Sequence, residues 1–256
     1  MVAIVAAAAS EARPAGADAI EGISLFPLGD KPRAGAELET AGFRLEGRRG
    51  SYASVIPRIE WNATELLGVR VRVPIYTLAL EGEPETQEGV GDTELRARFH
   101  LLGGEPLRIS AGWVTQLPTG TAGRGLGEGA VQGVPFVNLG YRIARVVVYL
   151  TSADAISFAG PHQRRWSNFV DPGSDHELRT TIGSLFAFTE KVSGGVVLTE
   201  TTILTAADRG RSFVTGALQL GAQPDPRLRL TLAQQLPIVG EERFSWKLNA
   251  AASYAF

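Results

Sequence analysis

Cysteine is absent from this chain, which excludes disulfide scaffolds, thiol nucleophiles and cysteine metal sites together. Histidine is scarce, with one residue each at positions 100, 162 and 176. No apolar run approaches the roughly 18 residues of a membrane-spanning helix, so any membrane crossing must be made by strands. The formal net charge is only −2, which argues against a nucleic-acid partner held by bulk charge.

Apolar residues are nevertheless plentiful, at 44 % of the 256 residues, and they alternate with polar ones. In the segment 68–76 the side chains of Val69, Val71 and Ile75 share one face, and Arg70 and Arg72 lie on the other. The segment 93–101 repeats the pattern. A period of two residues indicates strands with one apolar face.

The clearest strand is the last one, predicted over 242–256. Its apolar face carries Phe244, Trp246, Leu248, Tyr254 and Phe256, and its other face is small or polar. In all, the pattern predicts about twelve strands of about 10–13 residues, the length of tilted membrane strands, whereas soluble sheets favour about 5–6. The expected fold is an all-β, transmembrane up-and-down antiparallel β-barrel with both termini on the periplasmic side. A soluble β-sandwich is the alternative, because alternation alone does not say which face meets water.

Three regions are expected along the chain. Residues 1–17 resemble a signal peptide, residues 18–37 form an irregular periplasmic lead-in, and residues 38–256 form the barrel. Short connections alternate with longer ones, which are predicted to be outer loops, notably 118–133 and 159–176. Strands that run toward the short turns end on aromatic residues, which predicts an aromatic girdle at Trp61, Phe99, Tyr141, Phe186, Phe188, Tyr254 and Phe256.

Two resemblances add to this pattern. The terminal Phe256, with Tyr254 two residues before it, resembles the assembly signal by which bacterial outer-membrane barrels are recognised for insertion. The segments 89–99 (G-V-G-D-T-E-L-R-A-R-F) and 112–120 (G-W-V-T-Q-L-P-T-G), with the Gly-rich loop 123–129, resemble the outer-membrane barrels of the meta-pathway phenol-degradation family. That resemblance implies uptake or efflux of small compounds, with aromatic ones as a candidate class.

Charges that share the polar face are predicted to line the lumen, because a charge at the lipid midplane costs about 2–4 kcal/mol. The predicted lumen residues are Arg70, Arg72, Glu94, Arg96, Arg98, Arg108, Arg142, Arg227, Arg229 and Lys247, with Arg44 in the same phase. Two interpretations stay open: the charges brace the lumen as ion pairs, or they form a basic pore lining. Since Glu94 cannot neutralise four neighbouring arginines, at 70, 72, 96 and 98, the sequence predicts a net positive zone and an anion-leaning conductance.

No cofactor or metal site is expected. The histidines at 162 and 176 share a loop with Asp171 and Asp175, which fits a solvated loop better than a metal site. No segment pairs a histidine with a strand serine as an outer-membrane hydrolase would require. The sequence therefore predicts a non-enzymatic channel for small solutes, aromatic or anionic, in the bacterial outer membrane. Its expected partners are the lipid bilayer, the outer-membrane assembly machinery and the solute. A structural or partner-binding barrel with a blocked lumen is the alternative, and a hydrolase is the third.

Overall fold

The computed structural model describes residues 32–45, 47–64, 66–102, 106–159, 169–170, 173–205, 209–240 and 243–256. The expected signal-like segment 1–17 and most of the lead-in therefore lie outside the described residues. So do His162 and Asp171.

Strands make up nearly all of this part of the chain. They are β1 (Arg33–Leu45), β2 (Arg48–Asn62), β3 (Leu67–Arg72), β4 (Ile75–Leu80), β5 (Gln87–Val90), β6 (Thr93–Leu102), β7 (Leu107–Leu117), β8 (Val131–Ile143), β9 (Val146–Ala159), β10 (His176–Ala187), β11 (Val192–Ile203), β12 (Ser212–Asp225), β13 (Leu228–Gly240) and β14 (Trp246–Ala255). One short 3₁₀ turn, η1 (Ala122–Arg124), follows β7. Within the described ranges, no helix is long and apolar enough to cross a membrane.

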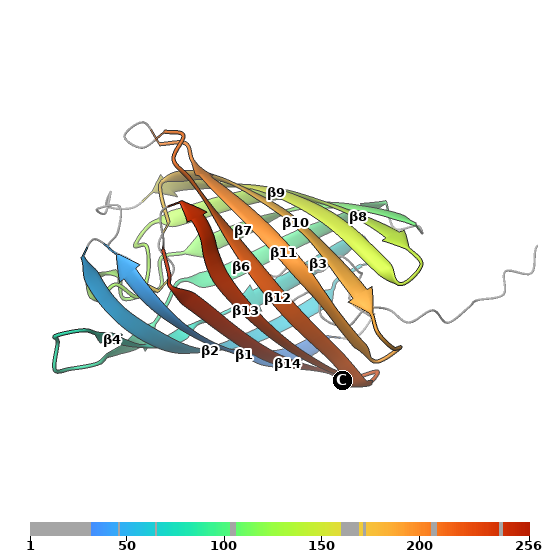
Figure 1. Ribbon diagram of the computed structural model, residues 1–256, viewed down its shortest axis with the longest axis horizontal. Coiled ribbons are helices and arrows are strands. Elements are labelled where there is room, and N and C mark those ends of the chain that lie inside the picture. Colours follow the sequence, from blue (N-terminus) through green and yellow to red (C-terminus); the bar gives the residue numbers. More distant parts are fainter. Residues whose placement is uncertain are drawn as a thin grey trace, which may run out of the picture.

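Every strand pairs with its neighbours in antiparallel fashion, and β1 pairs with both β2 and β14, which closes the sheet into a barrel (Figure 1). Two strands are interrupted. Pro74, which has no N–H to donate, separates β3 from β4, and Gly91-Asp92 separates β5 from β6. Counted with each interrupted pair as one strand, the barrel has twelve strands, which confirms the predicted fold class.

The wall of the barrel is apolar outside and mixed or polar inside. On β2, for example, Ser54, Arg58 and Glu60 are buried, while Val55 and Ile59 are exposed. Exposed large apolar side chains recur along the other strands, including Leu95, Val137, Leu150, Ile182, Leu198, Leu218 and Leu232. On β9, Val147 and Tyr149 are buried and point inward.

The two ends of the barrel differ. Pro32, Phe256 and the connections after β2, β6, β8, β10 and β12 lie at one end, which we call the turn end. The opposite end, which we call the loop end, carries the longer connections, among them 118–130. All the residues of the predicted aromatic girdle are exposed, and they lie where strands approach the turn end, as expected.

Three expectations are wrong, one at the turn end and two at the loop end. Strand β1 begins at Arg33, so the barrel starts five residues before the predicted boundary at 38. Phe43 and Leu45 are buried and Arg44 is exposed, which is the reverse of the predicted phase. Phe244 precedes β14 and packs inside rather than on the outer face. Phe43, Leu45 and Phe244 face inward because the interior beside β1, β2 and β4 is apolar at the loop end.

That apolar interior is built by strands and loops together. Phe43, Tyr52, Tyr76 and Leu78 form a buried cluster with Leu126 and Val170, which come from the connections after β7 and β9. The connection 118–130 therefore turns into the barrel mouth, whereas the sequence predicted only an outer loop over 118–133.

Candidate functional site

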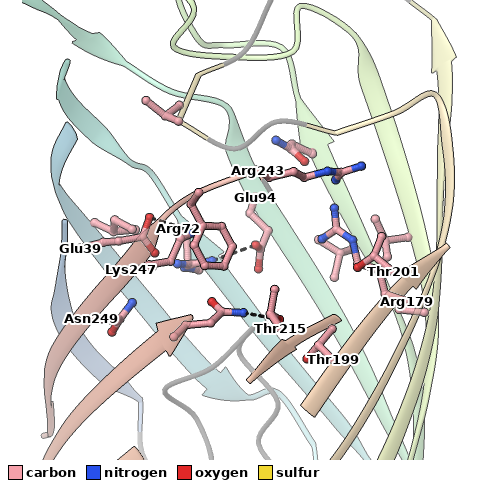
Figure 2. A pocket seen from close by; sticks show the side chains of 18 of the residues that line it. Glu39, Arg72, Glu94, Arg179, Thr199, Thr201, Thr215, Arg243, Lys247 and Asn249 are labelled. Atoms are coloured by element: carbon pink, nitrogen blue, oxygen red, sulfur yellow. Dashed lines mark hydrogen bonds and ion pairs between the residues drawn. The ribbon is translucent and has the colours of Figure 1, made fainter. Parts of the chain in front are cut away.

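The barrel encloses a cavity of about 260 Å³ in the loop-end half of its lumen. Inward side chains from strands all around the barrel line it, because each strand turns every second residue toward the axis. Figure 2 shows Glu39, Lys247 and Asn249 at one side of the cavity and Arg179, Thr199 and Thr201 at the other.

One wall of the cavity carries a network of buried charges. Glu94 accepts hydrogen bonds from Arg70 at 2.7 Å and from Arg72 at 3.1 Å. Arg72 also donates to Glu37 at 3.2 Å, and Arg58 lies 3.8 Å from the other oxygen of Glu37. Two carboxylates are thus shared among three guanidinium groups, and Asn249 donates a further hydrogen bond to Glu37.

Three cations lie against aromatic rings at the edge of the same cavity. Arg96 is 4.7 Å from the ring centroid of Phe136, and Arg243 is 4.4 Å from that of Phe213. Lys247 lies 5.5 Å from the ring of Phe244 and 3.6 Å from a carboxylate oxygen of Glu39. A ring face favours a cation without neutralising it. Lys247 and Arg243 also pair with carboxylates, so the ring contact adds most to the positive charge at the cavity surface at Arg96.

A second ion-pair cluster lies at the loop end of β10. Glu177 is fully buried and accepts hydrogen bonds from Arg179 at 3.2 Å and from both terminal nitrogens of Arg243. The backbone N–H of Ser174 donates to it at 2.7 Å. The sequence interpretation missed Glu177 and Arg243. Glu177 lies two residues before Arg179 on the same strand, so the alternation of polar and apolar residues could have predicted that it faces the lumen. Arg243 lies between two strands, where this alternation predicts nothing.

The wall on β11, β12 and β13 is uncharged and hydroxyl-rich. Thr199, Thr201 and Thr215 line the cavity there. Gln235 donates to Thr215 at 2.9 Å, and Thr199 shares a 3.0 Å hydrogen bond with Thr181. This wall offers donors and acceptors to a polar solute.

Below the cavity, toward the turn end, side chains fill much of the lumen. Arg58, Glu60, Arg98 and Gln219 are each at most 5 % exposed. Val147, Tyr149, Leu185, Val197 and Ala217 form an apolar cluster against the wall from β9 to β12.

The predicted lumen residues do not all meet. Arg70, Arg72, Glu94, Arg96 and Lys247 lie together on the cavity side. Arg98, Arg108 and Arg229 share the inward phase nearer the turn end, where Arg229 is paired in register with buried Ser253. Arg142 is half-buried and donates to the carbonyl oxygen of Ala144 at 3.2 Å.

The predicted lumen position of Arg227 is wrong, because this residue lies exposed in the turn between β12 and β13 and not on the barrel wall. Its hydrogen bond with the Tyr254 side chain raises the pKa of Arg227. Tyr254 and Phe256, the predicted assembly residues, are both exposed on the outside of the barrel. His176, considered as a metal ligand, lies 2.8 Å from Asp154 instead.

The fold is similar to that of solved outer-membrane barrels. An outer membrane channel from Pseudomonas putida F1 superposes with a TM-score of 0.73 at 14 % identity, covering 93 % of this chain and all of that one. The KdgM porin in complex with disordered oligogalacturonate gives 0.58 at 11 % identity, over 88 % of this chain and 99 % of that one. The NanC porin gives 0.58 at 10 % identity, over 86 % of this chain and 100 % of that one.

No protein-family model matches the chain, and no curated protein matches it. The resemblance to the phenol-degradation family therefore stays a prediction, and the similarity to the solved barrels concerns the fold.

Proposed function

We propose that the chain is an outer-membrane channel that passes small solutes by passive diffusion, with a preference for anions. The observation that carries the proposal is a polar, charged cavity enclosed in a closed barrel whose outer surface is apolar. Such a surface is stable in lipid, and the turn end, where β1 begins and β14 ends, would then face the periplasm. The similar solved structures are outer-membrane channels and porins, which supports this interpretation.

The preference for anions rests on the balance of charge. Among the described residues, five cationic and three acidic side chains line the cavity, and buried Glu177 beside it pairs with two of the cations, Arg179 and Arg243. The acidic ones are Glu37, Glu39 and Glu94. Closer to the turn end, buried or inward-phase cations outnumber buried Glu60. They are Arg33, Arg58, Arg98, Arg108 and Arg229. A confined lumen with an excess of one charge concentrates the opposite ion.

The solute class follows from the surfaces that line the cavity. Rings of Phe136, Phe213 and Phe244 offer stacking surfaces beside cations, and the threonine wall offers hydrogen bonds. This combination suits a small carboxylate that carries a ring or hydroxyl groups. Oligogalacturonate, the ligand of one similar porin, is itself a carboxylated saccharide.

Planar-bilayer recording of the purified full chain tests the proposal. We expect stepwise conductance and, in a KCl gradient, a reversal potential displaced toward that of chloride. If no conductance is seen over many insertions, the proposed channel function is contradicted and the structural alternative is favoured.

The scaffold alternative has its own supporting observation, the dense packing of Arg58, Glu60 and Arg98 below the cavity. If these side chains never part, the barrel is structural or partner-binding. Entry of radiolabelled chloride into vesicles containing the protein separates the two, since a blocked lumen admits none. The hydrolase alternative predicts release of fatty acid from phospholipid vesicles, which a lipase assay measures.

A further inference from the structure

The connection after β7 folds back into the barrel mouth. Gly125, Leu126 and Gly127 are buried, and Leu126 is among the few large side chains with no exposed surface. Leu126 packs with the apolar cluster on the inner face of β1, β2 and β4. Residues 125–127 of the segment 119–128 thus lie inside the mouth of the barrel, and the segment covers part of it.

One carboxylate holds this segment at both ends. Asp92, which is 6 % exposed, accepts a hydrogen bond from the backbone N–H of Gly120 at 2.9 Å. Its other oxygen accepts from the backbone N–H of Glu128 at 2.7 Å. Hydrogen bonds to an ionised carboxylate are stronger than those between neutral groups, so the loop depends heavily on this side chain.

The two ends of the segment are shaped for this contact. A Cβ atom added to Gly120 would lie 2.7 Å from Asp92 Oδ1, and one added to Gly127 would lie 2.5 Å from it. A Cβ atom on Gly89 would lie 2.9 Å from the Leu126 side chain. The G-V-G-D motif that begins the segment 89–99 and the L-P-T-G motif that ends the segment 112–120 therefore meet as the two halves of one attachment.

The segment also lies over the charged wall. Leu126, Gly127 and Asp92 line a second, smaller cavity of about 70 Å³ together with Arg72 and Glu94. On its other side the carbonyl oxygen of Gly125 accepts from Phe169 N–H at 3.0 Å, and Glu128 accepts from Gly173 N–H at 3.0 Å. A solute that enters from the loop end on this side meets the segment before it meets Arg72.

We infer that residues 119–128 are a latch that covers part of the loop end of the barrel and is held in place by Asp92. In the closed form the latch covers the charged wall, and release of Asp92 lets the segment lift and opens the way to the cavity. The gating role rests on the proposed channel function, but the closure itself does not.

The absence of native cysteine makes the latch directly measurable, since an introduced thiol is the single labelling site. In Leu126→Cys the thiol is shielded while the latch is closed. Adding Asp92→Asn replaces one acceptor oxygen by an N–H₂ group, which cannot accept from a backbone N–H. We expect labelling by a membrane-impermeant maleimide, with the protein in vesicles, to accelerate at least tenfold in the double variant.

Gly123→Cys is the matched control, because nothing lies within 4 Å of a Cβ atom there and its labelling should be equal with and without the Asp92→Asn substitution. Equal labelling of Leu126→Cys in both backgrounds would overturn the latch. Faster labelling together with raised chloride entry supports both latch and channel. Faster labelling with no chloride entry in either background supports the latch and removes the channel.

A second variant leaves Leu126 and Asp92 unchanged. Gly127→Ala should push the segment off Asp92 and speed hydrogen exchange at the amides of Gly120 and Glu128, whereas Gly123→Ala should not. Unchanged exchange in Gly127→Ala would contradict the latch.

Discussion

Arg72 on β3 reaches past β2 to Glu37 on β1, and their side chains form a 3.2 Å ion pair inside the barrel. Glu37 was assigned to the lead-in by sequence, so the arginine cluster has a second carboxylate beside Glu94. The predicted positive zone is therefore smaller than the sequence alone implied, and Arg96, held by a ring, becomes its main contributor on the cavity wall.

Glu37→Gln is the first prediction. Arg72 and Arg58 would lose a shared carboxylate, so we expect a stronger preference for anions and a less stable barrel. Breaking a buried ion pair costs about 3–5 kcal/mol, and a wet lumen lowers that figure. Reversal potential and the temperature of heat-modifiable gel migration measure the two effects. Glu85→Gln, at an exposed position in the β4–β5 turn, is the control and should change neither.

Arg96→Gln is the second prediction, and it has the opposite sign. Arg96 lies directly across from Arg70 in the β3–β6 register, so its removal relieves repulsion and should not destabilise the barrel. The reversal potential should move toward that of potassium. Arg44→Gln, on the outer face, removes the same charge without touching the lumen. An equal displacement in both variants would mean that overall charge, and not the cavity, sets selectivity.

Alternation predicted the barrel and the inward phase of β2, β3 and β6, because polar-in and apolar-out residues contrast sharply along those strands. It failed on β1, where Ala34, Gly35 and Ala36 provide no contrast to mark a strand. The register with β14, in which Glu37 lies opposite Ala251, is what fixes the phase there. The phase of Phe43 and Leu45 was predicted wrongly for a second reason, because these side chains face inward and pack with Leu126 and Phe169.

The parts of the site that the sequence did not predict depend on contacts between residues far apart in the chain. Arg243 is positioned by its hydrogen bonds to Glu177, which lies 66 residues earlier in the chain, and no local sequence pattern relates the two residues. The motif at 89–92 was recognised by resemblance alone, and its physical meaning, a carboxylate that holds a loop, appears when Gly120 and Glu128 are seen beside it.

Phe256→Ala is the third prediction. Phe256 is exposed at the turn end, and by resemblance it supplies the assembly signal. We expect less barrel in the outer-membrane fraction with unchanged synthesis, measured by immunoblot against total protein. Phe188→Ala removes another exposed aromatic of the girdle and controls for the loss of one interfacial ring. If both variants insert alike, the terminal residue has no special part in assembly.

The fourth prediction separates a membrane barrel from a soluble one. Val55 and Ser51 lie on the same outer face of β2, and both are exposed, but Val55 is near the middle of the strand and Ser51 is nearer the loop end. An arginine at the lipid midplane costs about 2–4 kcal/mol, and the cost falls to about 0–1 kcal/mol near the interface. Arg44 and Arg49, which are exposed at the loop end, already fit that profile.

We therefore expect Val55→Arg to lower the free energy of unfolding from lipid vesicles by about 2–4 kcal/mol and Ser51→Arg to change it little. On a water-exposed surface both substitutions would fall within about 0.5 kcal/mol of the native chain, because neither touches the interior. Equal, small effects in denaturant titrations would thus contradict the membrane barrel, whereas a depth-dependent cost requires lipid on that face.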